Sequence, residues 1–245
     1  MIEDKVTKGI MLDEGNNVDY TFDLNEFFRA DENGKFVYED SVKKFLDNLC
    51  SGKYPFSEHG HKAELNHTFW LLPRVNSAKA LERLLRSHPF FKEFEIVLAA
   101  GDGISSDDEL NIGGIYDLKK VEKSYDKVKK AIAENEKTIT LSVGQLTTGV
   151  TIPEWSAVLM LSNIKSPSLY FQAAFRAQNP YTFIRDGKLY RKENCYVFDF
   201  APDRTLVLFD ELANNLSISG SRTTGHREKN IKELLNFFPV IGEDD

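Results

Sequence analysis

The sequence is poor in cysteine and has no long apolar run. Its 245 residues include only two cysteines, Cys50 and Cys195, at distant positions. Such a pair forms neither a disulfide framework nor a metal site, and it fits a reduced cytoplasmic setting. No apolar stretch reaches membrane-spanning length, and we find no signal peptide. We therefore expect a cytoplasmic protein with no membrane partner.

An excess of positive charge is also missing. The chain carries a formal net charge of −7, with 41% apolar residues. Proteins devoted to nucleic-acid binding usually cluster Lys and Arg on one surface, so the acidic balance disfavours that class. The lysines of residues 119–130 fall in one helical stretch, which is typical of a solvated face. The apolar content is sufficient for a sizeable core.

A phosphate-binding P-loop is absent from the sequence. Each of the three Gly-Lys pairs is followed by Phe, Tyr or Leu where a P-loop requires Ser or Thr: Gly34-Lys35, Gly52-Lys53 and Gly187-Lys188. Residues 206–213 (LVLFDELA) mimic a Walker B strand, but an amphipathic helix is the favoured interpretation. His59, His61 and His67 have no Cys or carboxylate at ligand spacing, so we expect no metal site.

Strands and helices are expected to alternate through the middle of the chain. Apolar runs predict strands at residues 68–72, 95–100, 138–141, 157–161 and 195–200. Helices are expected at residues 39–49, 117–134 and 169–177, and another that Asn76 or Ser77 caps and that ends near Ser87. Trp70 and Trp155 lie in or beside strands and are expected to be packing anchors. This alternation predicts an α/β fold with a parallel sheet and helices on both faces.

The most specific pattern lies in residues 138–180. A β-branched strand enters a loop rich in Gly and Thr, and a helix with a Gln-x-x-x-Arg pattern follows, in which Gln172 and Arg176 stand. This stretch resembles motifs V and VI of superfamily 2 helicases and translocases, in their second RecA-like domain. It is most similar to the helicase subunits of type III restriction enzymes and related restriction-modification ATPases. Residues 67–85 resemble motif IV, and residues 94–103 resemble the next strand and its glycine turn.

The resemblance divides the chain and implies a RecA-like fold. It covers residues 65–213, which we expect to form a RecA-like helicase C-terminal domain. Residues 1–64 would be an N-terminal lead-in and linker, and residues 214–245 a helical C-terminal extension.

The resemblance also assigns site residues. In motif VI, Arg176 would be an arginine finger that meets charge on ATP, with Gln172 beside it in the catalytic group. Phe175 and Asn179 replace a Gly and a second Arg of the pattern. In motif V, Gly149 and Thr151 would contact the nucleotide together with Asn179, although Thr151 replaces an acidic residue.

Nucleic-acid contacts are implied at the ends of three expected strands. The resemblance places them at Arg74, Gly101, Thr147 and Thr148. Backbone phosphates can be bound by hydroxyls and amides without a large positive charge. For the two threonines, a turn whose hydroxyls are satisfied locally is an equal alternative. For Arg74, an arginine at the edge of the core is an equal alternative. For Arg176, the alternative to the favoured functional role is an ordinary salt bridge or surface arginine.

These observations predict the second motor lobe of an ATP-dependent DNA helicase or translocase, belonging to a restriction-modification system. ATP and Mg²⁺ would be bound mainly by an N-terminal RecA-like lobe of the same polypeptide, and this chain alone would be inactive. DNA, and a methyltransferase or specificity subunit, are the other expected partners. The alternative is a non-catalytic RecA-like module that binds nucleic acid or protein.

Overall fold

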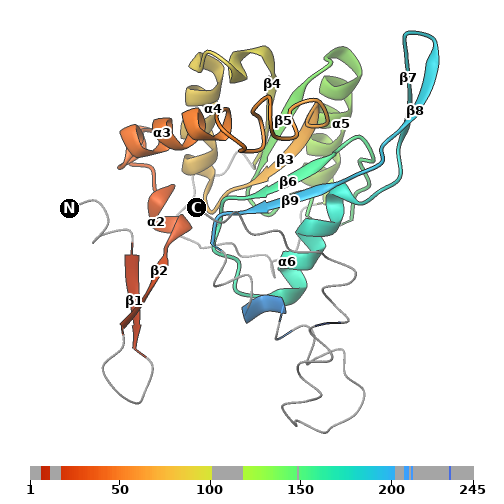
Figure 1. Cartoon of the computed structure of the whole chain (residues 1–245). Helices are drawn as coiled ribbons and strands as arrows, with labels where there is room; N and C mark the ends of the chain where they lie inside the picture. Colours follow the sequence, from red (N-terminus) through yellow and green to blue (C-terminus); the bar gives the residue numbers. More distant parts are fainter. Residues whose placement is uncertain are drawn as a thin grey trace, which may run out of the picture.

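A five-stranded parallel sheet forms the centre of the protein (Figure 1). The computed structural model describes residues 7–11, 18–100, 118–147, 149–201, 207–209, 211 and 232. The strand order is β4-β5-β3-β6-β9, and all four pairings are parallel. The strands are β3 (His67–Leu71), β4 (Glu95–Ala99), β5 (Thr138–Ser142), β6 (Ala157–Met160) and β9 (Tyr196–Asp199). The expected α/β fold with a central parallel sheet is confirmed.

The two faces of the sheet bury separate sets of side chains. Along β3, Phe69 and Leu71 pack into one apolar cluster, whereas Trp70 and Leu72 pack into the other. This alternation follows from the two-residue period of a strand. Burial on both faces explains why the strands read as nearly continuous apolar runs. Trp70 and Trp155 are fully buried, as expected of packing anchors.

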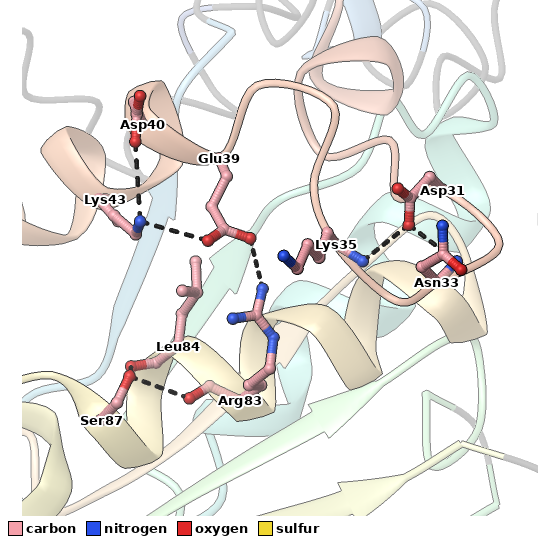
Figure 2. A network of polar contacts seen from close by, with 9 residues as sticks. All are labelled: Asp31, Asn33, Lys35, Glu39, Asp40, Lys43, Arg83, Leu84 and Ser87. Carbon is pink, nitrogen blue, oxygen red and sulfur yellow. Dashed lines mark hydrogen bonds and ion pairs between the residues drawn. The ribbon is translucent and has the colours of Figure 1, made fainter.

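The first face is covered by α3 (Glu39–Leu49) and α4 (Val75–Ser87). Polar contacts join the two helices at their outer side, as Figure 2 shows. Glu39 of α3 accepts a hydrogen bond from the Arg83 guanidinium of α4, and Lys43 lies 3.2 Å from the same carboxylate. The Arg83 contact is the main cause that lowers the pKa of Glu39. These groups are partly exposed, so burial of the helices supplies most of the stability.

The second face is covered by α5 (Leu118–Glu134), α6 (Pro167–Ala174) and the short 3-10 helix η2 (Phe175–Ala177). Pro167 begins α6, where its missing N–H costs no intrahelical bond. Within the expected tail helix, residues 207–209 are helical, and Phe209 packs 5.0 Å from the Phe171 ring of α6. The remainder of the expected tail lies almost wholly outside the described residues.

The N-terminal cap predicted for α4 is wrong. Neither Asn76 nor Ser77 caps the helix, because the chain leaves β3 extended only as far as Arg74 and turns helical at Val75. Arg74 occupies the cap position without a side-chain hydrogen bond. Ser77 lies inside the first turn with its hydroxyl buried, and among the described residues that hydroxyl has no partner. Packing against the sheet therefore decides where this helix begins.

Two antiparallel hairpins were not predicted from the sequence. One pairs β1 (Thr7–Met11) with β2 (Val18–Phe22), and the other pairs β7 (Thr182–Arg185) with β8 (Lys188–Arg191). Asp186 and Gly187 join β7 to β8, both with positive φ, at 51° and 71°. Two consecutive positive φ values are typical of the tight turn that Asp-Gly favours.

The N-terminal segment is attached to the carboxyl end of β6. The short helix α2 (Leu24–Phe27) is capped by the Asp23 carboxylate, which also accepts a hydrogen bond from the Asn163 amide at 2.9 Å. Asn25 accepts a hydrogen bond from the Asn163 backbone at 2.8 Å. Leu24 and Leu65 share one apolar cluster with Trp70 of the sheet. Within the described part of the chain, no helix is long and apolar enough to cross a membrane.

Candidate functional site

The neighbouring strands β5, β3 and β6 end at the same edge of the sheet. The backbone N–H of Leu72 donates to Ser142 at 2.8 Å, and that of Leu161 donates to Leu71 at 2.9 Å. Loops that leave this edge of a parallel sheet are where ligands bind in such folds. Arg74 lies two residues beyond Leu72, between β3 and α4. Its half-buried guanidinium makes no hydrogen bond or ion pair with any described residue.

The loop after β5 adopts an unusual backbone. Gly144, Leu146 and Gly149 all have positive φ, at 78°, 63° and 72°. A leucine rarely adopts this conformation, and Leu146 does so with its side chain buried. Burial of that side chain offsets the backbone strain, which is the kind of strain that concentrates at functional sites. The loop is also pinned to α5, because the Ser124 hydroxyl donates to Gln145 Oε1 at 2.9 Å.

Thr147 faces inward and not toward a ligand. Its side chain is only 2% exposed, and its hydroxyl donates to the Gly144 carbonyl at 2.6 Å. The alternative of a locally satisfied turn therefore describes this hydroxyl. A phosphate contact at Thr147 would have to use its backbone amide, and that contact stays a prediction. Thr148 and Gly101, the other two expected nucleic-acid contacts, lie outside the described residues.

Gly149 and Thr151 border a surface hollow of about 460 Å³ between the β5 loop and α5. The segment 149–151 forms one wall, and Val121, Glu122 and Tyr125 of α5 form the other. A Cβ at Gly149 would meet no atom within 4 Å, so the glycine is needed for its φ of +72° and not for space. Glu122 and Tyr125 were not predicted as site residues, since their helical spacing indicates only an amphipathic helix.

Arg176 joins the end of α6 to the segment that follows the β5 loop. Its Nε donates to the Gln172 carbonyl at 3.1 Å, and its Nη1 donates to the Val150 carbonyl. Burial lowers the pKa of the guanidinium from its usual value, but an arginine keeps its charge in proteins. Nη2 makes no hydrogen bond with any described residue. The expected motif V and motif VI residues are thus brought together, with donors remaining for an anion.

The two other motif VI residues have local contacts. Gln172 offers its backbone carbonyl to Arg176, while its side-chain amide lies 3.4 Å from the Ser168 hydroxyl. The Asn179 amide donates to the Arg176 carbonyl at 3.2 Å and so closes η2. Neither side chain lines the hollow beside Gly149. Their expected roles in catalysis and nucleotide binding remain predictions.

Lys192 is a half-buried cation that was not predicted as a site residue. Its Nζ donates to three carbonyl oxygens, those of Pro153, Trp155 and Ala177, at 2.9, 2.8 and 2.7 Å. Burial lowers the pKa of this ammonium. The three carbonyls come from the segment after Thr151 and from the end of η2, so Lys192 holds both site segments to the base of the β7–β8 hairpin. Because Lys192 stands in a polar run (residues 190–193, YRKE), the sequence indicates an exposed side chain and does not predict these contacts.

One curated protein is related to this chain at the sequence level. Over 220 residues, or 86% of the chain, it is 31% identical to the Mycoplasma pneumoniae protein "Putative type II restriction enzyme and methyltransferase RM.MpnORF110P C-terminus". The chain spans only 28% of that relative's length. No family model matches the chain.

Residues that resemble helicase motifs V and VI meet through Arg176 and Val150 beside the parallel sheet. Solved structures similar to this chain include Mss116p bound to ssRNA and AMP-PNP, with a TM-score of 0.44, 15% identity, and coverage of 86% of this chain and 33% of that one. The C-terminal part of the Fun30 ATPase domain has a TM-score of 0.38, 12% identity and coverage of 86% and 56%. The ATP-dependent Type ISP restriction-modification enzyme LlaBIII bound to DNA has a TM-score of 0.37, 13% identity and coverage of 79% and 14%.

Within the described residues, no group of three or more His, Cys, Asp or Glu side chains is arranged to hold a metal ion.

Proposed function

We propose that this chain is the second motor lobe of an ATP-dependent DNA helicase or translocase. The observation that carries the proposal is the contact between Arg176 and the Val150 carbonyl, next to the hollow bordered by Gly149 and Thr151. This contact joins two segments that are separate in sequence and that each resemble a nucleotide-contacting motif. One side of an interlobe nucleotide site would have this composition: a fixed guanidinium, a hydroxyl and an exposed backbone.

The residues fit the phosphate and sugar of ATP. Arg176 keeps Nη2 for a phosphate oxygen, and its position is already fixed by two carbonyls, which lowers the entropy lost on binding. Thr151 is exposed and lines the hollow, and its hydroxyl would bind a ribose hydroxyl. ATP would supply the phosphoryl group for transfer to water, while a P-loop and Mg²⁺ carboxylates of an N-terminal lobe would hold it.

DNA would bind at the carboxyl edge of the sheet. Arg74 has no partner among the described residues and lies at that edge, where the Thr147 backbone also lies. Gly101 and Thr148 remain part of this proposal. The module would grip one strand of double-stranded DNA, and closure of the cleft around ATP would shift the grip.

The wider role we propose is restriction and modification of DNA. The supporting observation is the 31% identity to the restriction enzyme and methyltransferase relative of Mycoplasma pneumoniae. In that setting a methyltransferase or specificity subunit would be a partner. The resemblance to type III helicase subunits belongs to the same proposal.

A second candidate function is a non-catalytic RecA-like module. One observation favours it: two of the Arg176 donors already bind backbone carbonyls, as they would in a purely structural clamp. The net charge of −7 also favours a module that binds protein.

Steady-state ATPase assays separate the two functions. We expect no turnover by this chain alone, and DNA-stimulated turnover when it is joined to an N-terminal lobe carrying a P-loop. Turnover by that joined protein that is unchanged after Arg176→Ala would favour the non-catalytic module. Robust DNA-dependent turnover by the isolated chain would contradict the division of the site between two lobes.

A further inference from the structure

The β7–β8 hairpin extends away from the sheet as an arm (Figure 1). It carries some of the most exposed apolar side chains of the described residues, since Ile184 is 75% exposed, Leu189 74% and Tyr190 42%. Exposed apolar side chains grouped on one element usually mark a binding surface. The arm adds no strand to the central sheet, and none of its residues lines the hollow beside Gly149.

Three aromatic rings lie in a row on one face of the arm. The rings of Tyr181 and Phe183 are 5.7 Å apart and inclined by only 19°, and the same values hold for Phe183 and Tyr190. Tyr181 and Phe183 share a face because they are two residues apart, and Tyr190 is the cross-strand partner of Phe183. Cross-strand aromatic pairs stabilise a hairpin, but the ring of Tyr190 remains exposed at the end of the row. We refer to these three residues as the ring row.

The arm is basic in an otherwise acidic chain. Residues 181–192 contain four basic residues and one acidic residue: Arg185, Lys188, Arg191 and Lys192 against Asp186. The whole chain has a net charge of −7. Lys188 and Arg191 are exposed. Aromatic rings combined with exposed positive charge are the features with which proteins bind single-stranded nucleic acid, because every base can stack on a ring and every phosphate attracts a cation.

The base of the arm is fixed to the proposed nucleotide site. The N–H of Lys192 donates to the Tyr181 carbonyl at 2.8 Å and closes the hairpin. The Lys192 ammonium binds the Ala177 carbonyl, next to Arg176, as well as two carbonyls just beyond Thr151. The arm and the site therefore share one half-buried anchor, Lys192.

We propose that the β7–β8 arm binds single-stranded DNA, with bases stacked on the ring row and a phosphate near Lys188, which lies on the same face of the hairpin. This inference rests on the proposed DNA motor function and adds a contact surface outside the motif residues. Single-stranded DNA fits the arm better than a protein partner, because the exposed cation Lys188 lies on the same face as the ring row. A protein docking on Ile184 and Leu189 would use the opposite face of the hairpin and would not need the ring row.

Fluorescence anisotropy with a labelled oligo-dT of about 20 nucleotides tests the proposal on this chain. We expect Phe183→Ala combined with Tyr190→Ala to weaken binding at least tenfold, and Tyr190→Phe, which keeps the ring, to leave it within about twofold. The matched control is Ile184→Ser combined with Leu189→Ser on the other face, which should also leave binding within about twofold. Lys188→Ala should reduce the slope of log affinity against log salt by about 0.7.

Each outcome of these binding measurements supports or overturns the arm proposal. Binding retained within about twofold by the ring variant, with an unchanged unfolding midpoint, overturns the proposal. Equal loss of oligo-dT binding in the Ile184 and Leu189 control also overturns it, because binding would then not depend on the face that carries the ring row. If Arg74→Ala weakens binding whereas the ring variant does not, the arm proposal fails and the DNA motor function stands. Absence of any oligo-dT binding overturns the arm proposal, while the ATPase test of Arg176 is unaffected.

Discussion

The guanidinium of Arg176 donates a hydrogen bond to the carbonyl of Val150, 26 residues earlier in the chain. This contact ties the end of the motif VI helix to the exit of the motif V loop. Because the same side chain also bonds to Gln172, its charge is held in one place before any ligand arrives. A preorganised charge stabilises a transition state without reorganisation during the reaction.

Arg176→Ala should reduce DNA-stimulated ATP turnover at least about a hundredfold in a polypeptide that contains both lobes. ATP affinity should change little, because a finger acts on transition-state charge more than on ground-state binding. Arg176→Lys should restore little turnover, since an ammonium lacks the planar fork of donors. Asn179→Ala, which removes only a hydrogen bond to the Arg176 carbonyl, is the matched mild variant. Turnover of Arg176→Ala within about threefold of the parent would make this residue structural.

Gly149→Ala should destabilise the fold by about 1–2 kcal/mol, because an L residue is strained at a φ of +72°. Gly34→Ala is the matched control, since Gly34 has the same φ and equal free space around its Cα. Urea unfolding should show a similar decrease in the free energy of unfolding for both variants. Only Gly149→Ala should also weaken nucleotide-dependent activity in the two-lobed protein. If both variants reduce activity equally, Gly149 has no role beyond its turn.

Lys192→Met should lower the free energy of unfolding by about 2–3 kcal/mol. Methionine retains most of the apolar stem but leaves three carbonyls without their shared donor, and unsatisfied buried groups are costly. Lys188→Met, at an exposed position of the same hairpin, should change stability by less than about 0.5 kcal/mol. Thermal and urea unfolding measure both. Equal effects of the two substitutions would show that the Lys192 contacts add no stability.

His67 should make stability depend on pH. Burial lowers its pKa to about 4, from an ordinary value near 6.5. Between these values the unfolded state takes up a proton that the folded state does not, so stability is complete above about pH 6.5 and falls as the pH falls toward 4. Through this one group, the free energy of unfolding changes by up to about 1.4 kcal/mol per pH unit.

His67→Gln, which cannot titrate but can still bond to the Thr138 hydroxyl, should flatten the curve of unfolding free energy between pH 4 and 6.5. His59→Gln, at an exposed position in the preceding loop, is the matched control. Urea unfolding at several pH values measures the difference. Parallel curves for His67→Gln and the parent would mean that His67 is protonated equally in both states.

The sheet and its covering helices could be predicted because their signals are local. β5 and β6 are apolar runs of β-branched and aliphatic residues, and the buried side chains of α3 recur at three- and four-residue steps. The start of α4 was misplaced because side-chain packing overrode the capping preference of Asn76 and Ser77. The β7–β8 hairpin was missed although Asp186-Gly187 is a strong turn signal, because its strands have only four residues each and β8 is exposed along its whole length, so they give no apolar run.

Of the candidate site, the sequence predicted some residues that lie near one another but not their geometry, and the roles of these residues remain predictions. Gly149 and Thr151 do border a hollow, and Arg176 does reach the same segment. The inward direction of the Thr147 hydroxyl could not be read from the sequence, because it follows from the positive φ values around it. The wall formed by Glu122 and Tyr125, and the position of Lys192, depend on how α5 and the hairpin pack, which involves residues far apart in the chain.

The place of β3 in the sheet has a consequence for how the chain folds. β3 is the earliest strand of this sheet in the sequence, yet it lies in its middle. One partner begins at Thr138, 71 residues after His67, and the other is preceded by Ser156, 89 residues after it. Pairings of such high contact order form slowly. While the chain is being synthesised, β3 therefore has two unpaired edges until more than half of the sequence has emerged, and a product truncated there would expose an apolar strand prone to aggregation.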